Sequence, residues 1–360
     1  MPRIQHRKIG FSHMFTCSTG NDVSDGDSGR SSGMTVVVGP DWKALLCTVV
    51  LVVGSTIIYV GRSSQSTGRS VLVSLLAVNT LGLLLRCALT EPGIIPVQPL
   101  PNSLPPMTVR EASSDLGGGL VAVERRWCTA CNLYRPLRTV HCRFCNVCIL
   151  RRDHHCPWTG TCVGERNYRY YVGFILSALV SATVIVVGSL WDFYVACHRW
   201  KSANPSDEWA DVLRGGIRHF GVLGVVVFLI GIMACVMLLN LVFFHWYLLR
   251  HNATTSEENK GGAYAQHPFS SGNRWLNIKS VLFGFPTPSL LGRQGHVKLL
   301  EVLAVKPIDM EEEGRIEVDS QPLPSPKSPA AVIEMEPVDM SDASEKLPNV
   351  SDASKYSGPA

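Results

Sequence analysis

Residues 128–162 read CTACNLYRPLRTVHCRFCNVCILRRDHHCPWTGTC and hold seven of the chain's 12 cysteines together with three histidines. Most of the cysteines come in pairs separated by two residues, the spacing that lets two ligands from one turn reach the same zinc ion. Two closed tetrahedral zinc sites need eight ligands, and this stretch offers ten thiol or imidazole groups. The stretch therefore predicts a domain folded around two zinc ions, and inert buried cysteines are the weaker alternative.

Two groups remain once eight are assigned to metal. If each site takes three cysteines and one histidine, one thiol and one imidazole are left, the minimum for an activated thiol nucleophile. An all-cysteine site beside such a mixed site would leave no thiol. Ligand number alone does not name the spare pair, but only at Asp153-His154-His155-Cys156 do an acid, an imidazole and a thiol crowd together. An imidazole that accepts the thiol proton raises the reactive thiolate fraction, and Asp153 would orient that imidazole.

Long apolar segments flank this stretch on both sides. The chain is 46% hydrophobic and only 17% charged, and its apolar residues cluster at 44–60, 71–85, 171–190 and 220–249. Each cluster is long enough to cross the hydrocarbon core of a bilayer, some with tilt. We therefore expect an α-helical polytopic membrane protein with four transmembrane helices and a cytosolic two-zinc cysteine-rich domain between helices 2 and 3.

The distribution of basic residues predicts the orientation in the membrane. Residues 91–170 carry ten Lys or Arg, against two in 61–70 and four in 197–219, and basic loops face the cytosol. Four spans then place the active site and both termini on the cytosolic side, where metal and thiolate chemistry is favoured over disulfides. The net charge of +4 is too small to indicate a nucleic-acid partner, and we expect no removable signal peptide.

Composition divides the chain into seven predicted segments. They are a cytosolic N-terminal segment (1–40), transmembrane helices 1 and 2 (41–90), a linker (91–126), the cysteine-rich zinc domain (127–170), transmembrane helices 3 and 4 (171–250), cytosolic C-terminal motifs (251–300) and a disordered tail (301–360). Five prolines and the Gly117–Gly119 run predict that residues 94–120 resist both helix and sheet. The acidic Ser/Pro-rich tail is either a passive extension or a regulatory segment.

Residues 128–171 resemble the cysteine-rich domain of the DHHC-type protein S-acyltransferases almost position for position. The likeness rests on Asp153-His154-His155-Cys156, which spells the family's motif, on Arg135-Pro136, His141-Cys142 and Pro157-Trp158, and on Asn167 five residues after Cys162. The resemblance implies that Asp153, His154 and Cys156 are catalytic. It also implies one zinc on Cys128, Cys131, His141 and Cys148, and a second zinc on Cys142, Cys145, His155 and Cys162.

Weaker matches lie outside the domain. Glu91-Pro92-Gly93 resembles the family's Asp-Pro-Gly, with Glu in place of Asp. Thr254-Thr255-Ser256-Glu257 resembles a Thr-Thr-x-Glu motif, which would tie the segment after the fourth span to the cysteine-rich domain. The alternative is a solvated capping segment at a helix end. Asn277 is similar to the Asn of the family's C-terminal element.

The resemblance implies a protein-cysteine S-palmitoyltransferase. Such an enzyme moves a long acyl group from acyl-CoA, here palmitoyl-CoA, to cysteines of membrane-associated proteins by a two-step ping-pong route through acyl-Cys156. Its cofactors would be two structural Zn²⁺, and its place an endomembrane or the plasma membrane. Exposing the acyl chain to water costs about 0.8 kcal/mol per methylene, so the lipid bilayer is itself an expected partner.

Two other functional classes compete with this interpretation. A membrane-anchored RING ubiquitin ligase is also zinc-rich, but it needs further paired cysteines downstream, and the next cysteine after Cys162 is Cys197. A scaffold or transporter that retained zinc and lost catalysis would not need Asp153, His154 and Cys156 intact.

Some polar residues of the predicted spans leave two interpretations open. Ser177 and Ser181 either line a cavity for the acyl chain or allow close helix packing. Asn240 and His245 are either functional, because polar groups in lipid are costly, or they form hydrogen bonds between helices.

The predicted topology has a direct test. A glycosylation acceptor placed near Ser113 is expected to remain unmodified, because the basic central loop stays in the cytosol. Acceptors in the loop of residues 197–219 serve as the control that can be modified. Glycosylation near Ser113 would refute the orientation.

Overall fold

The computed structural model describes residues 3–18, 34–62, 67–103, 105–113, 121–259, 269–285 and 287–291. All of these residues belong to one unit, 1–316. The predicted disordered tail, the Gly117–Gly119 run and residues 19–33 of the N-terminal segment lie outside the described residues.

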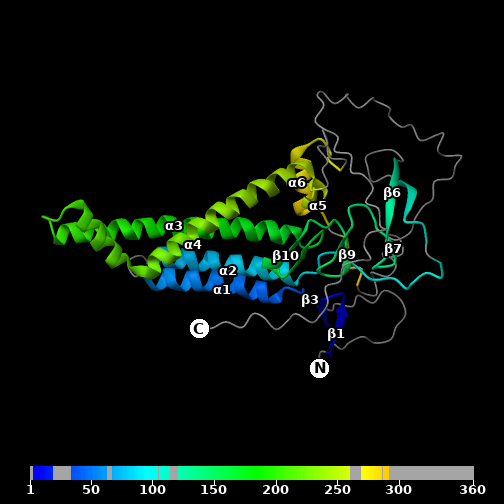
Figure 1. Cartoon of the computed structure of the whole chain (residues 1–360), viewed down its shortest axis with the longest axis horizontal. Coiled ribbons are helices and arrows are strands. Elements are labelled where there is room, and N and C mark those ends of the chain that lie inside the picture. The colour runs from blue at the N-terminus through cyan, green and yellow to red at the C-terminus, as the bar shows by residue number, and fades with distance from the viewer. Residues whose placement is uncertain are drawn as a thin grey trace, which may run out of the picture. The chain divides into compact units, whose positions relative to one another are not determined.

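Four long helices build the apolar part of this unit (Figure 1). They are α1 Trp42–Arg62, α2 Thr67–Leu89, α3 Tyr168–Ala203 and α4 Trp209–His251. Each is long and apolar enough to cross a membrane. Two shorter helices, α5 Thr255–Glu258 and α6 Arg274–Phe283, follow α4.

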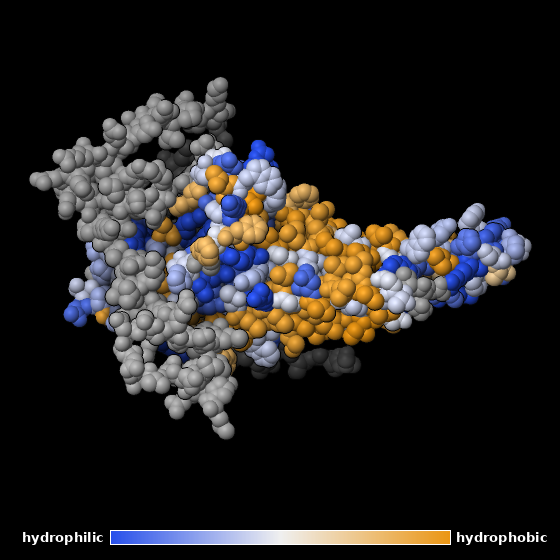
Figure 2. All heavy atoms as spheres, turned by 180° about the vertical axis from the view of Figure 1, so that it is seen from behind, coloured by the Kyte–Doolittle hydropathy of each residue, from blue (hydrophilic) through white to orange (hydrophobic). Residues whose placement is uncertain are grey.

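Many apolar side chains of the four long helices point outward, away from the bundle. Ile57, Val78 and Val222 are 65%, 68% and 79% exposed, and Figure 2 shows apolar residues around the middle of the bundle. Lipid accepts such a surface, and it requires a backbone whose hydrogen bonds are satisfied internally, as they are in a helix. The prediction of a four-span α-helical membrane protein is confirmed, with the cysteine-rich region between α2 and α3.

Two of the helices are longer than the predicted spans. The 36 residues of α3 correspond to about 54 Å, whereas a span needs about 30 Å. The helix continues past residue 190, and the first charged residue there, Asp192, forms an ion pair with Arg69 of α2 at 2.5 Å. In α4 the predicted start at residue 220 coincides with a break, since Gly221 has φ 70° and ψ 160°, a conformation that glycine adopts without strain.

The serines of α3 join it to α2. The Ser177 hydroxyl lies 2.8 Å from the Thr80 hydroxyl and accepts a hydrogen bond from Asn79 Nδ2 at 2.8 Å. Ser181 donates to the Ser177 carbonyl at 2.8 Å and lies 3.1 Å from the Thr80 hydroxyl. Of the two interpretations, these contacts favour close helix packing, and not an acyl cavity, at this level of the bundle.

Within the described residues, the cysteine-rich stretch and the segments before α1 and after α2 form eleven strands and one 3-10 turn, η1 Pro157–Thr159. The strands are β1 Arg3–Ile9, β2 Ser12–Ser18, β3 Met34–Val38, β4 Ile94–Ile95, β5 Thr108–Ser113, β6 Val121–Cys128, β7 Leu133–Tyr134, β8 Val140–Cys142, β9 Val147–Ile149, β10 His154–Cys156 and β11 Thr161–Val163. All pairings are antiparallel, in the orders β1-β2-β3, β4-β9-β8, β5-β6-β7 and β10-β11.

The prediction that residues 94–120 resist sheet is wrong for the described part of that segment. Strand β4 pairs with β9, with Ile94 opposite Ile149, and β5 forms a hairpin with β6. The prolines lie between β4 and β5, outside both ladders, where the missing N–H costs no strand hydrogen bond. Ile94, Val147 and Ile149 are fully buried, so the domain has a small apolar core in addition to its cysteines.

The N-terminal sheet β1-β2-β3 is a feature that the sequence patterns did not indicate. Ile9, Met14 and Val37 pack in one cluster with Cys142 and Cys145. The turn between β1 and β2 lies against the backbone of the domain, because a Cβ at Gly10 would be 2.2 Å from the Cys145 carbonyl oxygen. The N-terminal segment therefore braces the second group of cysteines.

Asn167, at the start of α3, connects the helices to the cysteine-rich domain. Its side chain is fully buried. Nδ2 donates to the carbonyls of Cys87 and Cys162 at 3.1 and 2.9 Å, and Oδ1 accepts from the Gly164 N–H at 2.8 Å. One side chain thus links the end of α2, strand β11 and the start of α3.

Asn167→Ala is expected to lower the thermal unfolding temperature of the purified protein strongly. It leaves three buried backbone groups without partners, at a cost of about 1–3 kcal/mol for each unsatisfied group. Asn240→Ala is the matched control, because Asn240 is exposed and bonds only to the Val236 carbonyl one turn away. Equal unfolding temperatures for the two variants would show that Asn167 does not stabilise the contact between the helices and the cysteine-rich domain.

Candidate active site and metal centres

Two groups of four cysteine and histidine side chains converge within the domain. In each group the four ligand atoms lie within 4.8 Å of one another, so each could hold a metal ion. The first group is Cys128, Cys131, His141 and Cys148, and the second is Cys142, Cys145, His155 and Cys162. These are the two sets that the family resemblance implies.

The distances fit a tetrahedral zinc ion. With ordinary bond lengths, such an ion separates two sulfurs by about 3.8 Å and a sulfur from a nitrogen by about 3.6 Å. His141 Nδ1 lies 3.6, 3.3 and 3.9 Å from the three sulfurs of its group. His155 Nδ1 lies 3.6, 3.4 and 3.5 Å from the sulfurs of the second group, and Cys145 Sγ lies 3.7 Å from Cys162 Sγ.

Side-chain alternation along β8 sends neighbouring ligands to different groups. His141 and Cys142 are consecutive on this strand, so their side chains point to opposite faces. His141 is paired in register with Cys148 across the hairpin, and both belong to the first group. The interleaved order of ligands in the sequence follows from this strand geometry.

Tight turns bring the paired cysteines together. Asn132 and Asn146 follow the cysteine pairs, and each has φ 54°, a left-handed conformation that asparagine tolerates better than most residues. Their N–H groups donate to the carbonyls of Cys128 and Cys142 at 2.8 and 2.7 Å. Each turn folds the chain back so that both thiols of a pair face one point.

The second group has an outer contact that sequence reasoning missed. Asp41, directly before α1, places Oδ2 2.6 Å from His155 Nε2, and Phe144 stacks on the His155 ring at 4.8 Å. A carboxylate on the far nitrogen fixes the tautomer and orientation of a ligating histidine. No spacing signal connects Asp41 to a residue 114 positions away.

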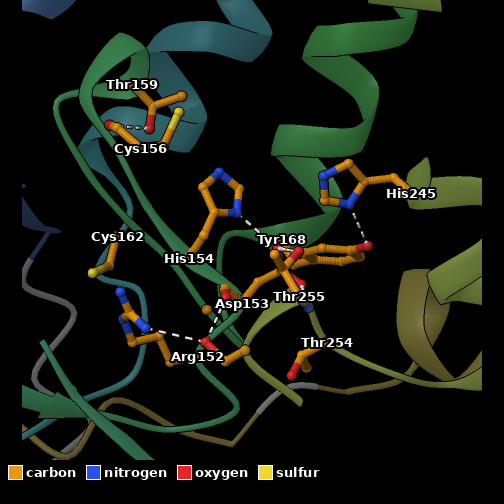
Figure 3. Close-up of polar contacts among 12 residues, drawn as sticks. Arg152, Asp153, His154, Cys156, Thr159, Cys162, Tyr168, His245, Thr254 and Thr255 are labelled. Atoms are coloured by element: carbon orange, nitrogen blue, oxygen red, sulfur yellow. Dashed lines mark hydrogen bonds and ion pairs between the residues drawn. The ribbon is translucent and has the colours of Figure 1, made fainter. Parts of the chain in front are cut away.

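Strand β10 separates the metal group from the remaining reactive side chains. His154, His155 and Cys156 are consecutive, and His155 is paired with Cys162 of its own metal group. Because side chains alternate along a strand, His154 and Cys156 share the opposite face. Figure 3 shows His154 between Cys156 and Asp153.

Asp153 and His154 form a buried, charge-assisted pair. The carboxylate is 1% exposed, and its Oδ2 lies 2.7 Å from His154 Nδ1. Burial opposes the charge of both groups. The hydrogen bond and opposite charge outweigh it, lowering the pKa of Asp153 and raising the pKa of His154 to about 9.

Cys156 is a buried thiol whose surroundings favour the thiolate. Burial raises its pKa, but the hydrogen bond and charge of His154 outweigh that effect and lower the pKa below its ordinary value. The Thr159 hydroxyl, in η1, bonds to the Cys156 carbonyl at 3.2 Å. A thiolate beside an imidazolium is the arrangement of an activated cysteine nucleophile.

His245 of α4 lies next to His154, beyond the pair of Asp153 and His154. It is 2% exposed, and its Nδ1 lies 3.0 Å from the Tyr168 hydroxyl of α3, so the predicted hydrogen bond between helices is present. The His245 ring also lies 6.0 Å from the His154 ring, and Tyr171 packs edge-on against His154 at 5.1 Å. Asn240, by contrast, bonds only within its own helix.

Comparison with known proteins identifies the family. A DHHC palmitoyltransferase profile matches residues 122–262. Palmitoyltransferase ZDHHC18 of Rattus norvegicus is 30% identical over 287 residues, covering 71% of this chain and 69% of the rat protein. The chain belongs to the DHHC palmitoyltransferase family.

Other DHHC relatives match over part of their length. Palmitoyltransferase ZDHHC14 of Mus musculus is 30% identical over 244 residues, which cover 61% of this chain and 46% of the mouse protein. Palmitoyltransferase ZDHHC9 of Homo sapiens is 29% identical over 256 residues, covering 64% of this chain and 65% of the human one. The chain thus spans less than half of the ZDHHC14 relative.

The Thr254-Thr255-Ser256-Glu257 motif, which follows α4, holds Asp153 in place. Thr255 donates from its backbone N–H to Asp153 Oδ1 at 2.9 Å and from its hydroxyl to Oδ2 at 2.8 Å. Ser256 Oγ donates to the Asp153 carbonyl at 2.6 Å. The predicted tie to the cysteine-rich domain is therefore present. The capping alternative is present as well, because Thr254 forms a capping box with Glu257.

Glu257 fixes this motif to the domain a second time. Its carboxylate accepts two hydrogen bonds of 2.7 Å from Arg138. This bidentate pair is largely buried, with side-chain exposures of 11% and 21%, and sequence spacing alone did not reveal Arg138 as the partner. Asn277 of α6 bonds to the Arg250 carbonyl at 2.8 Å, which secures α6 against the end of α4.

The Glu in place of the family's Asp still forms the turn after α2. Glu91 Oε1 accepts from the N–H groups of Gly93, at 2.7 Å, and Ile94. Its other oxygen lies 2.9 Å from Arg166 Nε. Glu91 therefore closes the turn after α2 and ties it to the segment before α3.

Metal content should distinguish the ligand sets from Cys156. Cys148→Ser is expected to lose one of two bound metal ions and to lower the unfolding temperature, because metal binding supplies folding free energy. Cys156→Ser should retain both ions. Metal analysis of the purified variants measures this, and loss of an ion from Cys156→Ser would make Cys156 a ligand.

Proposed function

We propose that the chain is a protein S-acyltransferase that moves a long acyl group from acyl-CoA to protein cysteine thiols. Palmitoyl is the expected acyl group. The proposal rests on the placement of His154 and Cys156 on one face of β10, with the buried Asp153 bonded to His154 Nδ1. The family membership and the palmitoyltransferase names of the relatives support the choice of acyl group.

The reaction exchanges one thioester for another and needs no nucleotide. Because Nδ1 of His154 is held by Asp153, Nε2 is the nitrogen that takes the Cys156 proton. The thiolate attacks the carbonyl carbon of acyl-CoA, and the bond to the CoA sulfur breaks as that sulfur takes the proton from His154. An acceptor thiol then gives its proton to His154 and attacks acyl-Cys156, which regenerates the free thiol.

Each metal group would hold one Zn²⁺ in a structural role. Three thiolates and one imidazole close the tetrahedron and leave no position for substrate. Zinc bound there supplies folding free energy and fixes the register of β8, β9 and β10. The chemical steps are carried by Asp153, His154 and Cys156.

The acyl chain would remain among apolar side chains after transfer to the enzyme. Cys156 belongs to one buried cluster with Leu84 of α2 and with Phe174 and Ile175 of α3. A chain attached to this sulfur therefore starts at the membrane end of the cysteine-rich domain, where about 0.8 kcal/mol per methylene favours apolar surroundings. Membrane-associated proteins with cytosolic cysteines are the acceptors that can approach this point.

The orientation and compartment complete the proposal. The basic residues between α2 and α3 support a cytosolic position for the cysteine-rich domain, both termini and the active site. Acyl-CoA and the lipid bilayer are the expected partners, without nucleic acid. An endomembrane or the plasma membrane fits this topology.

Incubation with an alkyne-labelled fatty acyl-CoA is expected to give a hydroxylamine-sensitive label on the protein and none on Cys156→Ser. His154→Ala should label about 10²-fold or more slowly, because the general base is lost. Thr255→Val should label about tenfold more slowly, because Asp153 loses a charge-assisted hydrogen bond. In-gel fluorescence in single-turnover time courses measures all three rates.

Thr56→Val is the control for Thr255→Val, because the Thr56 hydroxyl bonds only to the Val52 carbonyl in its own helix. Its labelling rate should match that of the unmodified chain. Undiminished hydroxylamine-sensitive label in Cys156→Ser would contradict the proposal.

A further inference from the structure

A cavity of about 910 Å³ lies between the helices at the end of the bundle away from Cys156. Helix α1 begins beside the active site, where Thr48 bonds to the Trp158 carbonyl at 3.0 Å, and its 21 residues span about 31 Å. Arg62, at the end of α1, lines the cavity. Figure 1 shows the connection between α3 and α4 at this same end, away from β10.

Three arginines and one carboxylate line this cavity. Arg62 comes from α1, Arg69 from α2, and Arg199 and Asp192 from α3. Counting only these groups, the cavity carries a net charge of +2. Because α1 is about as long as the hydrocarbon core is thick, about 30 Å, Arg62 at its end and Arg69 near the start of α2 lie at the depth of the lipid headgroups.

Contacts within the protein fix the guanidinium groups of Arg62 and Arg69. Arg62 donates to the Phe220 carbonyl and lies over the Phe220 ring at 5.1 Å. Gly224 leaves room for it, because a Cβ there would lie 2.7 Å from Arg62 Nη2. Arg69 bonds to the Gly188 carbonyl at 3.1 Å and to Asp192 at 2.5 Å. The positive charges are therefore held in place before any ligand arrives.

The same cavity has an apolar wall that continues onto the outside of the bundle. Leu72, Val187 and Trp191 line it, and they are 46%, 60% and 58% exposed. Exposed apolar side chains at this depth contact lipid chains, and tryptophan favours the interface between headgroups and hydrocarbon. A cationic pocket that opens onto an apolar surface matches a molecule with an anionic head and an acyl tail.

We propose that this cavity binds an anionic phospholipid of the leaflet opposite the active site. The phosphate would lie among Arg62, Arg69 and Arg199, since guanidinium groups bind phosphate oxygens in a bidentate manner. An acyl chain would follow Leu72 and Val187. A small phosphate could use the arginines but gains nothing from the apolar wall. This proposal does not depend on the acyltransferase activity.

Native mass spectrometry of the full chain with added lipid provides the test. Dioleoylphosphatidic acid is expected to bind in preference to dioleoylphosphatidylcholine. Arg199→Gln should weaken binding of the phosphatidic acid about fivefold, the effect of one basic residue near a charged lipid. The control is Arg214→Gln, because Arg214 does not line the cavity and pairs at the surface with Asp211, with a side chain 74% exposed.

Three outcomes would overturn the proposal. They are equal binding of the two lipids, an equal loss of binding in Arg199→Gln and Arg214→Gln, and full competition by glycerol 3-phosphate at the lipid's own concentration. The last outcome would assign the cavity to soluble phosphate compounds. Arg199→Lys should retain most of the binding of the phosphatidic acid because it keeps the charge, and this variant separates the loss of charge from a loss of folding.

Discussion

The pairing of β10 with β11 is the constraint on which the candidate active site depends. It places His155 opposite Cys162 in one metal group, and the alternation of side chains then turns His154 and Cys156 to the other face. A shift of one residue in this register would exchange the two faces. It would send the reactive thiol toward the metal and remove His155 from it. The geometry of three consecutive residues therefore separates the candidate metal ligand His155 from the proposed catalytic pair, His154 and Cys156.

The remaining contacts hold this strand from several directions. Asp41, before α1, reaches the metal-facing histidine, while Thr255, after α4, reaches the acid that orients His154. Asn167 joins the domain to the ends of α2 and α3. Because these partners lie at or next to the ends of the long helices, the position of the site is coupled to the packing of the bundle.

Local patterns predicted the features that depend on neighbours in the sequence. The four spans follow from runs of apolar residues, and a two-zinc domain follows from cysteine pairs at fixed spacing. The assignment of ligands to each metal group came from the family resemblance. Long-range contacts were not predictable in this way. Arg138 meets Glu257 across 119 positions, and the sheet β1-β2-β3 packs against cysteines far along the chain. The strands β4 to β6 were missed because their proline-rich connection dominates the local composition.

The central claim is that eight side chains hold two zinc ions and that Cys156 is free of them. X-ray absorption at the zinc edge of the purified chain tests it most directly, because the first shell reports the number of sulfur and nitrogen ligands. Each zinc is predicted to have three sulfurs at about 2.3 Å and one nitrogen at about 2.0 Å, with the same spectrum for Cys156→Ser. A fourth sulfur in either shell, or a spectrum that changes in Cys156→Ser, would contradict the account.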